Sequence, residues 1–206
     1  MQKLHIYLFL LLTFVTNIAL AQTSPTKVLV MGDSLSAGYG IDIQQGWVSL
    51  LEKELNKTHK VEMINASVSG ETSSGGKTRL PALLTEHKPH LVILELGGND
   101  GLRGQPLKLL QNNLQTMIDA STTAGAKVIL AGMQIPPNYG ARYSTQFKSL
   151  YSTLAEENQS GLIPFLLEGI GGKAELMQRD GIHPTAEAQP IIVKNVLPEV
   201  EKYLQP

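Results

Sequence analysis

The sequence predicts an α/β fold in which one parallel sheet is covered by helices on both faces. Five short apolar runs, expected as strands, begin about 30 to 36 residues apart, which is the length of a βαβ unit. They are Lys27–Met31, Val61–Asn65, Leu91–Leu96, Lys127–Gly132 and Gly161–Pro164. Strands that alternate with helices in this way favour a parallel sheet inside a three-layer domain.

The segments between the expected strands carry apolar residues at helical spacing. The first three such sets are Trp47, Leu50, Leu51 and Leu55, then Leu80, Leu83 and Leu84, then Leu107, Leu110, Leu114, Met117 and Ile118. A last helix is expected from Thr185 to Tyr203, offset or kinked by Pro190 and Pro198. No repeat and no linker after residue 26 divides the chain, so residues 22–206 are expected to form one domain.

Residues 1–21 have the pattern of a secretory signal peptide. A polar start with Lys3 is followed by the apolar run Ile6–Ala21, which ends in the small-x-small sequence Ala19-Leu20-Ala21. The run is shorter than the roughly 20 apolar residues of a membrane span. We therefore expect an exported protein, periplasmic or secreted, without a stable membrane span after cleavage; the alternative is an uncleaved anchor.

Composition excludes several classes of function. The chain has no cysteine, which excludes disulfides, thiolate metal sites and a cysteine nucleophile. Its net charge is -1 and no run of like charges indicates a nucleic-acid surface. No residues have metal-ligand spacing, so neither a metal nor another cofactor is expected. We expect a monomer whose partner is a small molecule or a lipid.

Polar loops follow the first three expected strands. They contain Gly32–Ser36, Ser67–Thr72 and Gly97–Asp100. In open α/β sheets, ligands bind beyond the carboxyl ends of the strands. If the first strand lies between the second and the third, these three loops meet and form a site.

Ser34 and His183 are the expected nucleophile and base. A serine hydroxyl needs a base within hydrogen-bond reach, and His183 alone follows the last strand, whereas His87 and His90 precede the third. Asp180 lies three residues before His183, so one turn can bring its carboxylate to the ring and fix the tautomer. Separately, each motif has a structural alternative: a capping Asp beside a surface His, and a tight strand-to-helix turn or phosphate loop at Ser34.

Two further residues favour acyl transfer. The developing oxyanion needs hydrogen-bond donors, and Gly70 can offer its backbone N–H while Asn99 offers its side-chain amide. The backbone N–H of Ser34 supplies a third donor. Gly70 could equally be a turn glycine and Asn99 part of an Asx turn. Their joint placement after three strands favours the catalytic interpretation.

The ordered motifs resemble those of the SGNH (GDSL) hydrolases over nearly the whole chain after the signal. They are Gly32-Asp33-Ser34-Leu35, Gly70, Gly97-Gly98-Asn99-Asp100 and Asp180-Gly181-Ile182-His183. Longer stretches, such as Glu95–Gly104 and Met133–Gly140, are similar to the periplasmic thioesterase I/protease I/lysophospholipase (arylesterase) subgroup. The resemblance implies a flavodoxin-like α/β/α sandwich with strand order 2-1-3-4-5 and metal-free chemistry.

The resemblance also implies roles for individual residues. Ser34, Asp180 and His183 match the catalytic triad, and Ser34, Gly70 and Asn99 match the oxyanion donors. The family's loop after Asn99, here Gly101–Pro106, adjusts when an acyl chain binds, and the chain is one residue shorter near Gln105-Pro106. The expected substrate-binding residues are Leu35, Gly101, Leu102, Arg103, Ile135 and Pro136.

The expected activity is hydrolysis of carboxylic esters or thioesters through an acyl-enzyme. Apolar residues in the edge loops could form an acyl groove, or could simply pack within the loops: Leu35, Leu102, Met133, Ile135, Pro136 and Pro137. Two alternatives remain open. One is a carbohydrate acetylesterase with the same triad, and the other is a flavodoxin-like binding protein that holds a phosphate or flavin at the Ser34 loop.

Overall fold

The sheet has five parallel strands in the order β2-β1-β3-β4-β5, which confirms the expected fold. The structure is a computed structural model and describes residues 24–204. The strands are β1 Thr26–Gly32, β2 Val61–Asn65, β3 Leu91–Glu95, β4 Lys127–Ala131 and β5 Gly161–Ile163. Each differs from its expected bounds by no more than a residue at either end. Apolar runs therefore placed every strand correctly.

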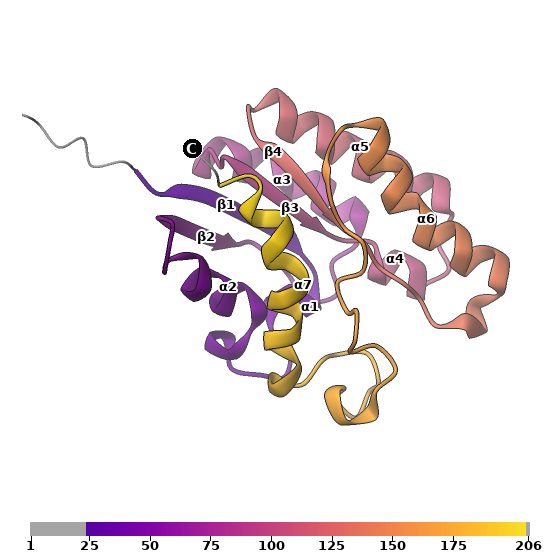
Figure 1. The fold of residues 1–206 in the computed structure, drawn as a ribbon. Coiled ribbons are helices and arrows are strands. Elements are labelled where there is room, and N and C mark those ends of the chain that lie inside the picture. Colours follow the sequence, from indigo (N-terminus) through magenta and orange to yellow (C-terminus); the bar gives the residue numbers. More distant parts are fainter. Residues whose placement is uncertain (1–23, 205–206) are drawn as a thin grey trace, which may run out of the picture.

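Helices cover both faces of the sheet (Figure 1). One face packs against α2, Trp47–Leu55, and α7, Gln189–Glu201. The other packs against α3, Ser73–His87, α5, Leu107–Thr123, and α6, Ala141–Glu157. The alternation within β1 explains this division, because successive strand side chains point to opposite faces. Val28 and Val30 contact the α2–α7 core, and Leu29 and Met31 contact the α3–α5–α6 core.

The last helix is shorter than expected. The 3-10 turn η4, Ala186–Ala188, precedes α7, and the helix ends at Glu201 rather than Tyr203. Pro190 lies in the first turn of α7, where a missing N–H costs no hydrogen bond. Pro198 is accommodated inside the helix. The expected offset by proline is therefore seen at the start of the helix.

Short elements lie at the carboxyl edge of the sheet. Asp33 alone separates β1 from helix α1, Ser34–Ala37, and Leu96 and Gly97 separate β3 from helix α4, Gly98–Leu102. The remaining 3-10 turns are η1 Ile43–Gln45, η2 Pro137–Tyr139 and η3 Ala174–Leu176. Strand-to-helix turns of this kind leave the first N–H groups of each helix without helical acceptors. Ser34 in α1 and Asn99 in α4 both line the cleft described below.

The predicted signal peptide lies outside the described residues. Within residues 24–204, no helix has the length and apolar character needed to cross a membrane. Export therefore stays a prediction from residues 1–21.

Candidate active site

The strand order brings the three polar loops together. Because β1 lies between β2 and β3, Ser34 at the end of β1 is flanked by Gly70 after β2 and Asn99 after β3. All three residues line one cleft, which His183 also lines. The condition on which the sequence argument depended, a central first strand, is met.

Ser34, His183 and Asp180 form a continuous hydrogen-bonded chain. His183 Nε2 lies 2.8 Å from Ser34 Oγ, and His183 Nδ1 lies 2.7 Å from Asp180 Oδ2. With a proton on Nδ1 donated to the carboxylate, Nε2 is free to accept the serine proton. The distances lie within the range expected for a nucleophile and its base. The three side chains are therefore arranged for general-base activation of Ser34.

Asp180 is held as a carboxylate. Its Oδ1 accepts the backbone N–H groups of His183 at 3.0 Å and of Ile182 at 2.9 Å. These bonds, the His183 backbone bond first and the ring bond second, lower the pKa of Asp180 to about 2. Hydrogen bonds to the charged form favour that form. Asp180 consequently stays ionised down to strongly acidic pH and stabilises an imidazolium.

Backbone hydrogen bonds join the two ends of the loop that carries Asp180 and His183. Met177 and Pro184 form an antiparallel bridge, and Gln178 N donates to the His183 carbonyl at 2.7 Å. The Gln178 side chain also donates to the carbonyl of Tyr39 at 2.8 Å. The loop is thereby tied to the segment after α1. This contact fixes the base relative to the nucleophile across a large sequence separation.

The other described histidines lie away from Ser34. His90 Nδ1 accepts the N–H of Lys27 at the amino end of the sheet, and His87 ends α3 on the same side. His59 follows α2, and its Nδ1 lies 2.9 Å from the hydroxyl of its neighbour Thr58. Among the described histidines, His183 is the one that lies beside Ser34, and its role as base stays a prediction.

Gly70 owes its identity to its backbone conformation. Its φ is +79°, a region that residues with a Cβ rarely adopt. A Cβ placed there would meet no atom within 4 Å. The sequence left open a turn glycine beside the role as N–H donor, and the positive φ shows that the turn itself requires glycine here. The turn keeps Gly70 beside Ser34 in the lining of the cleft.

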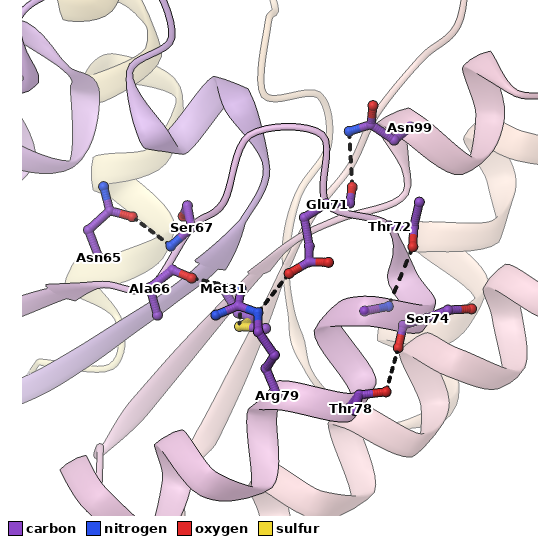
Figure 2. A network of polar contacts seen from close by, with 11 residues as sticks. Met31, Asn65, Ala66, Ser67, Glu71, Thr72, Ser74, Thr78, Arg79 and Asn99 are labelled. Carbon is purple, nitrogen blue, oxygen red and sulfur yellow. Dashed lines mark hydrogen bonds and ion pairs between the residues drawn. The ribbon is translucent and has the colours of Figure 1, made fainter.

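The side-chain amide nitrogen of Asn99 donates two hydrogen bonds. Its Nδ2 donates to Asp33 Oδ2 and to the carbonyl oxygen of Glu71, each at 3.0 Å. Figure 2 shows the second of these bonds, which joins α4 to the loop after β2. An oxyanion in the cleft must therefore share or replace one of these acceptors. These two acceptors hold the amide nitrogen of Asn99, rather than its oxygen, toward Asp33 and Glu71.

An arginine on α3 braces the Gly70 loop (Figure 2). Arg79 Nε lies 2.7 Å from Glu71 Oε2, and its Nη2 donates to the Ala66 carbonyl at 2.9 Å. One guanidinium thus joins both ends of the segment between residues 66 and 71. From the other side, Arg103 Nη2 donates to the Gly70 carbonyl at 3.3 Å. These bonds restrict movement of the segment that carries Gly70.

Two buried carboxyl groups lie beneath the Ser34 turn. Glu95 Oε2 accepts from Asp33 N at 3.1 Å and from Ser36 Oγ at 2.5 Å, while its buried Oε1 has no partner among the described residues. Burial raises the pKa of Asp33 to about 6, against opposing hydrogen bonds. Burial and the nearby Asp33 charge raise the pKa of Glu95 well above its ordinary 4.5. Glu95 therefore keeps its proton to a higher pH than an exposed glutamate.

Replacing Glu95 with glutamine should change how stability depends on pH. A raised carboxyl pKa stabilises the fold below pH 4.5, and this contribution is lost as the pH rises toward the folded-state value. Between pH 4.5 and the folded-state pKa of Glu95, the unfolding free energy of Glu95→Gln should therefore rise relative to that of wild type by up to about 1.4 kcal/mol per pH unit. Urea unfolding measured at successive pH values checks this.

The matched control is Glu62→Gln, which removes an exposed glutamate from β2. Its stability curve should run parallel to that of wild type over the same range. Asp180 does not interfere, because its lowered pKa places its loss of stability below pH 3.8. Parallel curves for Glu95→Gln and wild type would contradict a raised Glu95 pKa.

The cleft has a volume of about 680 Å³ and is mainly apolar. Four of the expected substrate-binding residues line it: Leu35, Leu102, Ile135 and Pro136. The other two do not. Gly101 is buried in α4, where a Cβ would meet Phe147 and Ile135 at 2.7 and 2.8 Å, and exposed Arg103 points its guanidinium to the Gly70 carbonyl.

Several lining residues were missed by the sequence argument. The segment after β5 contributes Phe165, Leu166 and Leu167, and Met177 follows from the loop before Asp180. Tyr39 packs its ring against His183, with ring centroids 4.4 Å apart. Tyr39 lies between two glycines, a pattern that predicts a loop with an exposed aromatic residue. Its contact with His183 joins segments that are distant in the chain, so no local pattern predicts that contact. Glu95, an acid at the end of an apolar strand, was a visible signal.

Residues 24–204 contain no group of three or more His, Asp or Glu side chains placed to hold a metal ion.

An α/β sandwich with a Ser–His–Asp chain at the carboxyl edge of its sheet has the arrangement of a serine hydrolase. The family described as GDSL-like Lipase/Acylhydrolase matches residues 30–190. The chain belongs to this family, which confirms the resemblance seen in its motifs, and it is an ester or thioester hydrolase.

Individual relatives cover almost the entire chain. "Esterase TesA" of Pseudomonas aeruginosa is 50% identical over 196 residues, which span 95% of this chain and 96% of that protein. "Thioesterase 1/protease 1/lysophospholipase L1" of Escherichia coli (strain K12) is 43% identical over 187 residues, 90% of this chain and 86% of that protein. The crystal structure of the psychrotrophic esterase EstA from Pseudoalteromonas sp., inhibited by monoethylphosphonate, superposes with a TM-score of 0.83 at 43% identity, covering 87% and 98% of the two chains.

Proposed function

We propose that the protein hydrolyses carboxylic esters and thioesters of apolar acyl groups, with Ser34 as nucleophile. The observation that carries the mechanism is the chain from Asp180 through His183 to Ser34, with separations of 2.7 and 2.8 Å. Its relatives carry the names of esterases, thioesterases and lysophospholipases, which supports acyl substrates.

In the proposed reaction, Ser34 Oγ attacks the acyl carbonyl while His183 Nε2 takes its proton. Asp180 holds the ring and stabilises the imidazolium. Ser34 N–H, Gly70 N–H and the Asn99 amide donate to the oxyanion of the tetrahedral intermediate. His183 then protonates the leaving alcohol or thiol, and in the second half-reaction activates water to release the acid.

The shape and lining of the cleft support an apolar acyl group. From Ser34 the lining extends over the ends of β3, β4 and β5, through Leu102, Ile135 and Phe165. A carbohydrate acetylesterase with the same triad needs polar groups for the sugar, and this lining is mostly apolar. The apolar cleft therefore favours a longer acyl chain over acetyl.

A series of p-nitrophenyl esters and acyl thioesters of increasing chain length tests this proposal. Each methylene buried in the cleft contributes about 0.8 kcal/mol, so kcat/KM should rise up to about fourfold per methylene from acetyl until the cleft is filled. Phe165→Ala should flatten the rise, and Leu109→Ala, an exposed apolar residue on α5, should leave it unchanged.

The outcomes separate the alternatives. Sharp preference for acetyl over longer chains would favour the carbohydrate acetylesterase. Absence of turnover on every ester and thioester would contradict the proposal as a whole. Tight binding of a flavin or phosphate without turnover would support the binding protein.

We further propose that residues 1–21 are a signal peptide and that residues 22–206 form a single domain, exported to the periplasm or secreted as a monomer. The apolar run that ends in Ala19-Leu20-Ala21 supports cleavage after residue 21. N-terminal sequencing of the exported protein tests cleavage after residue 21, and its mass in solution tests the monomer.

A further inference from the structure

Asn99 needs a fixed orientation to act as a donor. A side-chain amide has an NH₂ end and a carbonyl end of nearly equal size, and the surrounding hydrogen bonds decide which faces a given group. Here both groups around Nδ2 are acceptors, Asp33 Oδ2 and the Glu71 carbonyl. If the amide turned over, its oxygen would face these two acceptors. The pair of acceptors thus selects the donor orientation.

Asp33 links this amide to the turn that carries the nucleophile. Its Oδ1 accepts the Leu35 N–H at 3.0 Å and so caps α1, while Oδ2 accepts from Asn99. Its own N–H donates to Glu95 Oε2 at 3.1 Å. Asp33 is 2% exposed. Both carboxylate oxygens of Asp33 therefore accept a hydrogen bond, and its backbone N–H is held separately by Glu95, so the carboxyl group has little freedom to turn.

Helix capping alone does not account for this residue. Asp42 caps η1 in the same way, accepting the Gln44 N–H at 2.9 Å, but it lies exposed to water. Asn caps a helix as well as Asp does and carries no charge to desolvate. The buried carboxylate at position 33 costs free energy, which its high pKa reflects. The hydrogen bond from Asn99 to the second carboxylate oxygen of Asp33 is what distinguishes it from a residue that only caps a helix.

We propose that Asp33 is a positioning residue that holds the Asn99 side chain in its donor orientation, from which an oxyanion shares or takes over one of the two N–H groups. The inference rests on the proposed acyl transfer at Ser34. The second acceptor, the Glu71 carbonyl, is a backbone group braced by Arg79, so Asp33 is the side chain through which the orientation can be changed.

The test is a double-mutant cycle between Asp33 and Asn99, measured on an ester that the wild type hydrolyses. Asp33→Asn can keep the cap through its oxygen but turns an NH₂ group toward the Asn99 NH₂. Asn99→Ala should lower kcat about 10²- to 10³-fold, as expected for loss of one oxyanion donor. Asp33→Asn should lower kcat about 10- to 100-fold with KM changed by less than about threefold, since only the donor's orientation is lost.

The cycle distinguishes positioning from general destabilisation. If Asp33 acts through Asn99, adding Asp33→Asn to Asn99→Ala should change kcat by less than about threefold. Asp42→Asn, the matched exposed cap, should leave kcat and KM unchanged. Asp33→Ser, which keeps a capping oxygen and lacks the second one, should behave like Asp33→Asn and covers the case in which that variant does not fold.

A direct measurement is the ¹⁵N–¹H NMR signal of the Asn99 side-chain amide. One of its two protons should move upfield and exchange faster in the Asp33 variants. Unchanged kcat and amide signals in folded Asp33 variants would overturn the inference, as would effects that multiply in the double mutant. Absence of ester turnover by the wild type would instead contradict the proposed function.

Discussion

Ser34→Ala should lose nearly all turnover while it keeps its fold. Removal of the nucleophilic oxygen leaves only binding and the oxyanion donors, so kcat should fall on the order of 10⁴- to 10⁶-fold. Ser34 is the half-buried first residue of α1, capped by Asp33, and its side chain contacts His183 rather than the core. Ester hydrolysis and thermal unfolding, measured on the same preparation, check both halves of this expectation.

Covalent labelling provides the complementary measurement. A fluorophosphonate should modify the wild type at one serine, and peptide mapping should locate it at Ser34. Ser34→Ala should not be labelled, whereas Ser152→Ala, which removes an exposed hydroxyl on α6, should label and turn over normally. Ordinary hydrolysis by folded Ser34→Ala would refute the assignment of the nucleophile.

Asp180→Asn should be nearly as damaging although it changes few atoms. The amide oxygen can still accept the N–H groups of Ile182 and His183, which now bond Oδ1. The NH₂ group then faces His183 Nδ1 and donates to it, which places the ring proton on Nε2. That tautomer cannot take the Ser34 proton, so kcat should fall about 10⁴-fold.

The pattern of kinetic change tests this explanation. KM should change little, because Asp180 is not among the residues that line the cleft. Asp119→Asn, a change to an exposed carboxylate on α5, should leave kcat unaffected. Loss of less than about tenfold in folded Asp180→Asn would show that the carboxylate does not set the tautomer.

Much of the fold was predictable because its signals are local. Each strand is a short apolar run bounded by polar loops, and β2 has the bounds expected from the sequence. The end of the last helix was wrong by two residues because no glycine or other stop signal marks the region after Glu201. Helix ends depend on weak local preferences, whereas a buried strand needs a continuous apolar run.

The candidate site was partly predictable for a related reason. Ser34, Gly70 and Asn99 each follow a strand, so the parallel topology alone sends them to one edge. Asp180 and His183 are neighbours in sequence, and one turn brings them together. Gly101 and Arg103 were expected at the substrate because of their position after Asn99, but they lie outside the cleft lining, and contact with substrate stays a prediction for both.

The sequence by itself determined the parallel α/β architecture and predicted which groups react, since both inferences depend on periodicity and on loop position. Only the tertiary structure decided how the groups are held. Asp33 beneath Asn99, Glu95 beneath Asp33 and Tyr39 against His183 are contacts between segments distant in the chain. Such contacts arise from packing in three dimensions, and for this reason no local pattern in the sequence records them.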